Sequence, residues 1–282
     1  MNAYSTSWLT AIAPIIWGST YFVTTEFLPD GYPLTIAMLR ALPAGILLLI
    51  IVRRLPSGKW WLKSLLLGGL NFSIFWSMLF IAAYRLPGGI AATIGAIQPL
   101  VIIILGYLIY GSPIHHLSLS AAVLGVGGIA LLVISPDVAF DPMGLTAGVI
   151  GAVSMAIGTI LTHRWKPPVS LLTFTSWQLI AGGILLLPLA MWIEPPLPSL
   201  SKANITGLIY LSLIGAALTY TLWFRGLFKL DPSIVSVLGF LSPVSAILIG
   251  WLLLGQSLNA TQILAVIIVL ITVWLSQINS HQ

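Results

Sequence analysis

The stretch from Arg85 to Gly111 reads RLPGGIAATIGAIQPLVIIILGYLIYG, and a degenerate second copy, KLDPSIVSVLGFLSPVSAILIGWLLLG, runs from Lys229 to Gly255. Glycine and proline are common in any membrane helix, but here they occupy the same positions in both copies and so set the register. The match predicts that the chain is built from two related halves. At an offset of 144 residues the matching pairs are Leu86/Leu230, Ile90/Ile234, Gly95/Gly239, Pro99/Pro243, Ile103/Ile247, Gly106/Gly250, Leu108/Leu252 and Gly111/Gly255.

Each copy is an apolar run that is long enough to cross a bilayer and that carries a proline in its middle, Pro99 or Pro243. A helix that is bent or narrowed at such a residue leaves room at the interface between two halves. Matched pairs of interrupted hydrophobic segments are therefore the best sequence sign of a transporter's binding site. We expect Gly95, Pro99, Gly239 and Pro243 to shape such a site.

The composition excludes a soluble fold. Of the 282 residues, 59% are hydrophobic and only 6% are charged, whereas a solvated surface carries far more charge. Cysteine is absent, so there is no disulfide framework and no thiolate ligand or nucleophile. The net charge of +5 comes from loop cations and does not indicate a nucleic-acid partner. The N-terminal sequence MNAYSTSW has no basic region or cleavage site typical of a signal peptide.

The pattern of apolar runs predicts an all-α polytopic membrane protein with ten transmembrane helices. Each run has about 20 residues, which matches the hydrocarbon core of a bilayer. The short polar connectors leave no space for a soluble domain. The expected spans are Trp8 to Thr25, Pro33 to Val52, Leu62 to Tyr84, Gly88 to Tyr110, Leu117 to Ser135, Met143 to Thr162, Ser170 to Ile193, Ile205 to Phe228, Pro232 to Leu254 and Thr261 to Gln277.

The loop charges predict the orientation in the membrane, because cytoplasmic loops are enriched in Lys and Arg. The side shared by both termini carries seven Lys and Arg residues, whereas the other side has two, Arg85 and Lys202, with most of the acids. We therefore expect a multi-pass protein of the inner (plasma) membrane with both termini in the cytoplasm. The seven cations are Arg53, Arg54, Lys59, Lys63, Arg164, Lys166 and Lys229.

Because each half has five spans, the first half ends on the opposite side of the membrane from where it began. The second half therefore has the inverted membrane orientation. The segment from Leu34 to Leu49 also overlays Leu172 to Leu187 at an offset of 138, which extends the repeat. We expect a 5+5 inverted repeat with halves at residues 1–138 and 139–282. Two such halves can exchange conformations, so that a central site opens alternately to either side.

Arg40 is the one charge clearly inside a span, where burial of a charge is costly and marks a functional candidate. Its planar guanidinium can donate two parallel hydrogen bonds to a substrate carboxylate. Alternatively, it donates to backbone carbonyls or extends to the membrane–water interface. Its partner in the repeat is the neutral Gln178. No Asp or Glu lies inside a span, and Glu26 lies at the end of the first, so proton coupling is not indicated.

Deep aromatic and polar residues are the candidate lining of a central cavity, although each alone can equally be packing between helices. Together they favour a flat, aromatic or amphipathic ligand. The two residues Gln98 and Ser242 stand beside the paired prolines and are polar at mid-membrane. The candidate substrate-binding residues are Trp17, Tyr21, Arg40, Phe75, Trp76, Gln98, Trp177, Gln178, Tyr220, Phe240 and Ser242.

No residues suited to catalysis or metal binding are visible in the spans. An intramembrane enzyme needs a nucleophile with a base, paired aspartates or a metal cluster. His115 and His116 are loop residues without acidic or thiol partners at ligand spacing. We expect no catalytic residue, no metal and no cofactor.

Several short motifs stand out: WGSTY from Trp17 to Tyr21, then Arg40, the segment from Arg85 to Pro99, and Gly158, Gln178 and Pro243. They resemble the EamA family of the drug/metabolite transporter superfamily over essentially the whole chain. Within it, the stretch AAYRLPGGIAATIGAIQPL is similar to the PecM-type exporters of pigments or metabolites. The resemblance implies a ten-helix inner-membrane carrier with a central cavity between its halves. Smaller four-helix relatives use a glutamate of the first helix for proton exchange, and this chain has none in the interior of its first span.

The expected function is a secondary transporter that exports small amphipathic or aromatic metabolites, such as amino acids, pigments or drug-like compounds, by alternating access. Its partners are then a small-molecule substrate and the lipid bilayer, with no nucleic acid, and we expect it to work as a monomer. Substrate identity, direction and ion coupling stay open. The alternatives are an intramembrane enzyme and a non-transporting sensor or assembly subunit.

Overall fold

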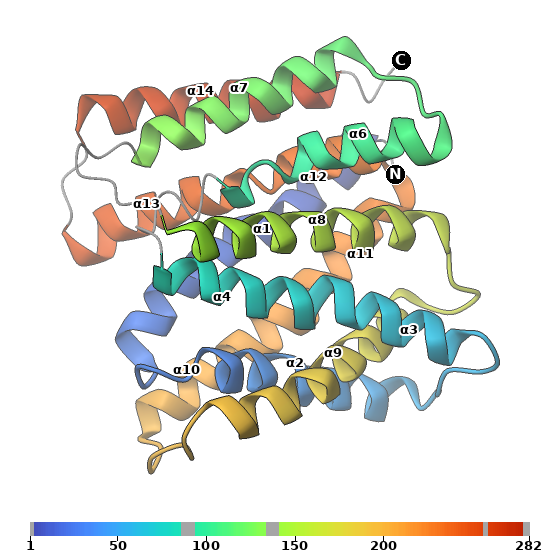
Figure 1. Cartoon of the computed structure of the whole chain (residues 1–282), viewed down its shortest axis with the longest axis vertical. Coiled ribbons are helices and arrows are strands. Elements are labelled where there is room, and N and C mark those ends of the chain that lie inside the picture. Colours follow the sequence, from blue (N-terminus) through green and yellow to red (C-terminus); the bar gives the residue numbers. More distant parts are fainter. Residues whose placement is uncertain (1–2, 86–93, 134–140, 256–258, 279–282) are drawn as a thin grey trace.

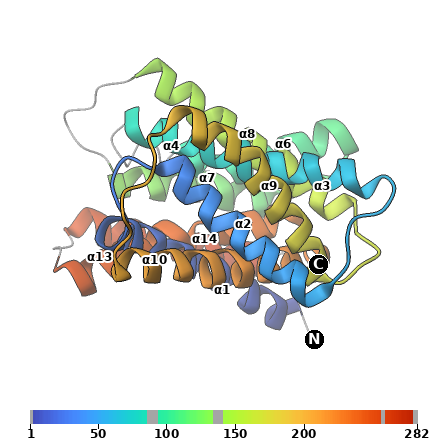
Figure 2. The same cartoon turned by 90° about the horizontal axis from the view of Figure 1, so that it is seen from below.

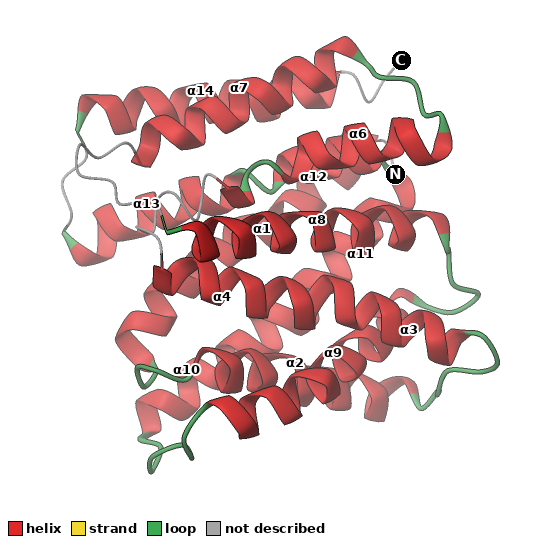
Figure 3. Cartoon of the chain, viewed as in Figure 1, coloured by secondary structure: helices red, strands yellow, loops and turns green. Residues whose placement is uncertain are grey.

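The computed structural model describes residues 3–85, 94–133, 141–255 and 259–278, and every regular element in these ranges is a helix (Figure 3). The expected all-helical fold is thus confirmed. The elements are α1 (Ala3–Phe27), α2 (Pro33–Val52), α3 (Trp60–Gly68), η1 (Gly69–Ile74), α4 (Phe75–Arg85), α6 (Gln98–Tyr110), α7 (His116–Val133), α8 (Pro142–Arg164), α9 (Leu171–Ile193), α10 (Lys202–Ser212), η2 (Leu213–Leu218), α11 (Thr219–Lys229), α12 (Pro232–Leu238), α13 (Leu241–Leu254) and α14 (Ala260–Ile278).

Six helical segments of the described chain are long and apolar enough to cross a membrane, and α6, α7 and α14 contribute shorter apolar helices. Large apolar side chains cover the outside of the bundle, and Trp192 is 90% exposed and Leu108 is 69% exposed. Such a surface is suited to lipid. The expected count of ten spans stays a prediction, because residues 88–93 of the fourth span and the end of the fifth lie outside the described residues.

Helices from the two halves pack in matching pairs. The helix α2 packs along α9 at one end of the bundle, and α7 packs along α14 at the other (Figure 1). Between them, α1 contacts α11 and α13, and the corresponding helix of the second half, α8, contacts α4 and α6. Figure 2, seen from the α2/α9 end, shows α4, α6 and α8 along one side and α1, α10 and α13 along the other.

Two glycines hold α2 and α9 close together. A Cβ on Gly45 would lie 2.7 Å from the backbone nitrogen of Ile180, and a Cβ on Gly183 would lie 2.8 Å from the Cβ of Leu42. Both contacts obey the same offset of 138 residues, since Gly45 corresponds to Gly183 and Leu42 to Ile180. The α2/α9 crossing is therefore symmetric and depends on small residues, as is common between membrane helices.

The ends of α2 show how the sequence sets helix boundaries. Pro33 stands in the first turn, where a missing N–H costs nothing, and Arg53 ends the helix in the left-handed region at φ 49°. The Glu194 carboxylate accepts hydrogen bonds from the amides of Leu34 at 2.6 Å and Thr35 at 2.7 Å. A carboxylate at a helix N-terminus satisfies unpaired amides and interacts favourably with the helix dipole. Glu194, which follows α9, thus ties the two halves together at this end.

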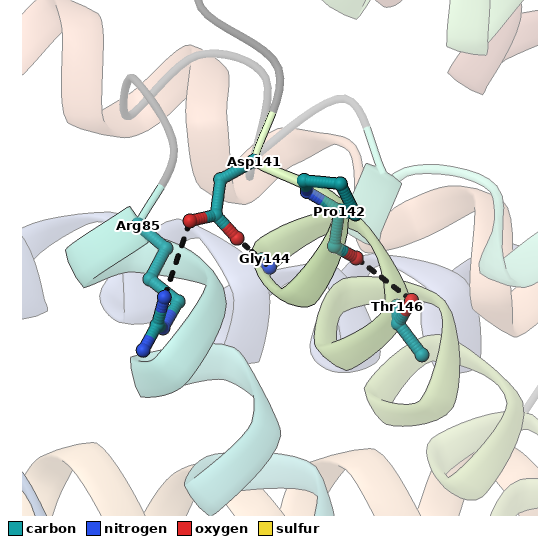
Figure 4. A network of polar contacts seen from close by, with 5 residues as sticks. All are labelled: Arg85, Asp141, Pro142, Gly144 and Thr146. Carbon is teal, nitrogen blue, oxygen red and sulfur yellow. Dashed lines mark hydrogen bonds and ion pairs between the residues drawn. The ribbon is translucent and has the colours of Figure 1, made fainter.

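Asp141 makes a similar cap at the start of α8 (Figure 4). Its carboxylate accepts from the Gly144 amide at 2.8 Å and pairs with the exposed Arg85 guanidinium at 3.1 Å. The hydrogen bond from Gly144, followed by the interaction with Arg85, holds the pKa of Asp141 below its ordinary value of 3.8. The folded protein therefore favours the ionised form of this carboxyl.

We expect the Asp141→Asn variant to be less stable than the parent protein at pH 7 and equally stable in acid. A carboxyl with a lowered pKa stabilises the fold above its unfolded-state pKa, and this contribution is lost as the pH falls through the folded-state pKa. Melting temperatures of both proteins in detergent between pH 7 and about pH 2, below the lowered pKa, provide the test. A difference that does not change with pH would contradict this role for the ionised group.

Candidate functional site

A cavity of about 330 Å³ lies at the centre of the bundle, between the two halves. We call it the central cavity. The helices α1, α2, α4, α6, α8, α10, α11, α12 and α13 line it, together with the segment that leads into α6. It extends along α1 from Trp17 to Thr25, toward the face of the protein opposite the two chain termini (Figure 1).

Most of the residues selected from the sequence lie together in this cavity. The substrate-binding candidates among its lining residues are Trp17, Arg40, Phe75, Trp76, Gln98, Tyr220, Phe240 and Ser242. All four residues expected to shape the helices also line it, namely Gly95, Pro99, Gly239 and Pro243. The structure thus brings residues from both halves to one place, and whether they bind a substrate stays a prediction.

Two candidates have other positions, and a third cannot be placed. Trp177 is buried between helices, where its Nε1 donates to the carbonyl of Arg54 at 2.7 Å. Gln178 is also fully buried, and its Oε1 accepts from Asn71 Nδ2 at 2.8 Å. These two side chains therefore join α9 to its neighbours. Tyr21 stands on α1, but its side chain lies outside the described part of the chain.

Arg40 has two specific neighbours in the cavity. Its Nη2 donates to the carbonyl of Gly215 at 2.6 Å, and its guanidinium carbon stands 5.1 Å from the centroid of the Trp76 ring. The first contact is a charge-assisted hydrogen bond, and the second is a cation–π interaction. Together they hold the cation in the cavity lining, with an aromatic face beside it.

The Gly215 carbonyl is available because η2 is a π-helical turn. The Thr219 amide donates to Ile214, five residues back, and to Ala216, so it leaves Gly215 to other donors. Gly215 then accepts from Arg40 and, at 2.8 Å, from the Thr219 hydroxyl. That hydroxyl in turn accepts from Trp17 Nε1 at 2.9 Å. The π-helical turn therefore links α1, α2 and α11 at the cavity.

The first half contains a π-helical turn at the corresponding place. The element η1 covers residues 69–74 and η2 covers residues 213–218, which again differ by 144. In η1 the Leu70 carbonyl accepts from the Ser154 hydroxyl at 2.9 Å. Phe75 and Trp76 follow η1 directly, as Thr219 and Tyr220 follow η2. Each π-helical turn thus precedes a residue pair at the centre of the bundle.

Aromatic rings form one side of the cavity. Tyr220 is at the centre of this group, with ring centroids 4.9 Å from Trp17 and 4.6 Å from Phe72. Trp17 also stands 5.1 Å from Trp223, which lines the cavity one turn after Tyr220. Tilted and edge-to-face pairs of this kind pack firmly and give a rigid surface.

The polar groups of the lining include several hydrogen-bond donors and no carboxylate among the described residues. Two buried donors, Gln98 Nε2 and Trp223 Nε1, have no acceptor in the described part of the structure. Buried polar groups normally have partners, so these two are available to a ligand. With Arg40, they suit a ligand that carries acceptor oxygens or a negative charge.

The paired prolines interrupt the helices that enter the cavity. Proline cannot donate to the residue four positions back and clashes with its carbonyl, which here is Gly95 or Gly239. Gly239 and Phe240 accordingly form a turn between α12 and α13. The Ser242 amide donates there to the carbonyl of Gly239, three residues back instead of the usual four. A Cβ added to Gly95 would meet nothing within 4 Å, so the cavity is open at that point.

We expect Pro99→Ala and Pro243→Ala to lower transport several-fold without lowering the melting temperature. Alanine permits a continuous helix, which changes the shape of the cavity while adding a backbone hydrogen bond. Counterflow in liposomes and thermal melting measure the two effects. The control is Pro188→Ala, because Pro188 is exposed within α9 and does not line the cavity. Equal loss of transport and melting temperature would indicate a folding role instead.

Some lining residues were not among the candidates. Trp223 lies three residues after Tyr220 on the same helix face, and this spacing could have identified it as a lining residue. Met155 and Leu211 also line the cavity, and nothing in their local sequence distinguishes them from packing residues. Within the described residues, no three His, Asp or Glu side chains lie close enough to hold a metal ion.

Comparisons with known proteins give consistent matches. The sequence pattern of the EamA-like transporter family matches residues 5–134 and 142–277. The chain is 45% identical to protein PecM of Dickeya dadantii (strain 3937), over 91% of this chain and 87% of that protein. It is 30% identical to the uncharacterized inner membrane transporter YedA of Escherichia coli (strain K12), over 95% and 89% of the two chains. A solved crystal structure of a protein with 16% identity superposes with a TM-score of 0.83 and covers 99% of each chain.

Proposed function

The chain belongs to the EamA-like transporter family, and from this premise we propose that it is a secondary transporter that exports small amphipathic or aromatic metabolites. Amino acids, pigments and drug-like compounds are the candidate substrate classes. The name of the relative YedA supports placing the protein in the inner, or plasma, membrane. We propose that it works there as a monomer and without a cofactor.

The observation that carries this proposal is the position of Arg40 in the central cavity. The guanidinium lies beside the aromatic face of Trp76, and the buried donors of Gln98 and Trp223 belong to the same lining. A ligand with an acceptor or anionic group and an apolar ring satisfies both parts of this surface. A few well-placed polar groups in an apolar pocket are typical of small-molecule sites.

The mechanism we propose is alternating access between two inverted halves, residues 1–138 and 139–282, with five spans each. The matched packing of α2 with α9 and of α7 with α14 supports this division. With both termini in the cytoplasm, the central cavity faces the outside, because it extends to Thr24 and Thr25 at the far end of α1. Inward opening of the same site completes the cycle.

Counterflow with purified protein in liposomes tests the proposal. Liposomes are loaded with unlabelled amino acids, aromatic carboxylates or nucleosides in turn, and uptake of the labelled compound is measured with and without a pH gradient. Accumulation of one class supports a carrier and names its substrate, and the gradient shows whether protons are coupled. No exchange by folded protein would favour the alternatives, which are an intramembrane enzyme and a non-transporting sensor or assembly subunit.

A further inference from the structure

A second cavity, of about 460 Å³, lies on the face of the protein where both chain termini and the ends of α6 and α8 are found. We call it the inner pocket. The ends of α6 and α8, the start of α12 and the segment from Ser112 to Ser118 line it. Figure 1 shows α6 and α8 ending on the side of the two termini. The sequence did not predict this pocket.

The inner pocket and the central cavity share three helices, and on each helix their lining residues lie only a turn or so apart. On α6, Pro99 lines the central cavity and Ile102 lines the inner pocket. On α12 the corresponding residues are Ser236 and Ser233. The two cavities are therefore arranged end to end along the same helices.

A thin apolar layer stands between them. Ile102, Ala156 and Ile160 form a small buried cluster, with exposed fractions of 3%, 0% and 7%. Val101 and Leu105 pack against it. Ile102 and Ile160 also line the inner pocket, so this layer is its floor. A constriction of this kind excludes water and charged solutes until the helices move apart.

The lining of the inner pocket is mainly basic. Its lining contains two histidines, an arginine and a lysine, but among the described residues only one carboxylate, that of Asp231. The Asp231 carboxylate is already engaged, because it caps α12 through the amide and hydroxyl of Ser233. The two cations Arg164 and Lys166 outnumber this carboxylate, and a cleft with an excess of one sign of charge raises the local concentration of the opposite ion. The four basic residues are His115, His163, Arg164 and Lys166.

We propose that the inner pocket is the entrance of the transport pathway from the side of the termini, and that it selects amphipathic organic anions. The anionic group of the substrate stands among the four basic residues, and its apolar part rests on the layer formed by Ile102, Ala156 and Ile160. Separation of this layer then passes the substrate to Arg40 in the central cavity. This inference rests on the proposed transport function and names the charge of the substrate.

The absence of cysteine from the chain makes the proposal directly testable. A Cβ on Gly106 in the inner pocket would meet only Ser112, at 3.9 Å, and Gly95 in the central cavity has open space around it. Gly106→Cys and Gly95→Cys are therefore matched probes for thiol labelling in sealed liposomes. Where Gly106→Cys fails to fold, Ser112→Cys replaces it, since Ser112 lines the same pocket.

We expect an anionic methanethiosulfonate reagent to label Gly106→Cys from the side of the termini about tenfold faster than a cationic reagent of the same size. Gly95→Cys is expected to be labelled from the opposite side. Adding Arg164→Gln and Lys166→Gln to Gly106→Cys should remove most of the anion preference. Equal rates for both reagents, or unchanged preference after neutralisation, would overturn the assignment.

Two further measurements distinguish a transport pathway from a pocket that holds a lipid headgroup. Labelling of Gly106→Cys is expected to block transport, whereas labelling of Ser57→Cys, on an exposed loop at the same end, is not. If anionic phosphatidylglycerol protects Gly106→Cys and neutral phosphatidylcholine does not, the pocket holds a lipid headgroup and the proposal is wrong. The labelling rates need no transport activity, so failure of the proposed function is recognised separately.

Discussion

Replacement of Arg40 by alanine is expected to lower transport by about ten- to a hundredfold while leaving expression and the melting temperature nearly unchanged. A hydrogen bond to a charged group contributes about 1.5–3 kcal/mol, which corresponds to this range. Folding is expected to survive because the Gly215 carbonyl keeps its second donor, the Thr219 hydroxyl at 2.8 Å. The substitution is therefore expected to weaken substrate binding and to leave the stability of the helix bundle nearly unchanged.

Two companion variants make this test specific. Arg40→Lys keeps the charge but loses the fork of donors, and we expect intermediate transport with weaker substrate binding. Arg225→Ala removes an arginine from α11 that lines neither cavity, and we expect it to transport normally. Counterflow rates and melting temperatures are measured for all three variants. Normal transport by Arg40→Ala would exclude substrate anchoring by this residue.

The largest loss of stability is expected from Gly45→Val and Gly183→Val at the α2/α9 crossing. The new side chains would meet the Ile180 backbone nitrogen at 2.7 Å and the Leu42 Cβ at 2.8 Å, where little can yield. Overpacking of this kind costs about 1–3 kcal/mol, or roughly 2–12 °C in melting temperature. Because the two contacts are equivalent, the two variants are expected to lose similar amounts.

Gly127→Val is the matched control for these variants. Gly127 lies within α7, is exposed, and has no heavy atom within 4 Å of an added Cβ. Thermal melting in detergent, followed by size-exclusion chromatography, compares the three proteins. A loss as large in Gly127→Val as in Gly45→Val would assign the effect to the β-branched residue in a helix rather than to the crossing.

The sequence was most informative where backbone chemistry decides the structure. The Gly95/Pro99 and Gly239/Pro243 pairs line the central cavity together, and a proline removes a backbone hydrogen bond of its helix wherever it stands. Apolar length likewise predicted α2 from Pro33 to Val52 at its observed bounds. Such features depend on residues that are close together in the chain, and so they can be read without the fold.

Features that depend on tertiary packing could not be predicted in this way. The turns η1 and η2 have no distinctive composition, and their carbonyls at Leu70 and Gly215 have a role only because Ser154 and Arg40 reach them from other helices. Trp177 and Gln178 have the same residue types as the cavity lining, yet they bond to groups outside the cavity. The face that a membrane helix presents to its neighbours is set by packing, since lipid is as apolar as the core.

The contacts between α2 and α9 also bear on how the protein is made. Each of these helices carries both partners of the contact, a glycine and the large residue three positions before it, namely Leu42 with Gly45 and Ile180 with Gly183. A surface of this kind is self-complementary, as in an isologous dimer. With the halves inverted as proposed, however, a second copy of the first half enters the membrane in the same orientation and cannot reproduce this crossing. The matching surface for α2 is therefore α9 of the same chain, which covalent linkage keeps at a high effective concentration.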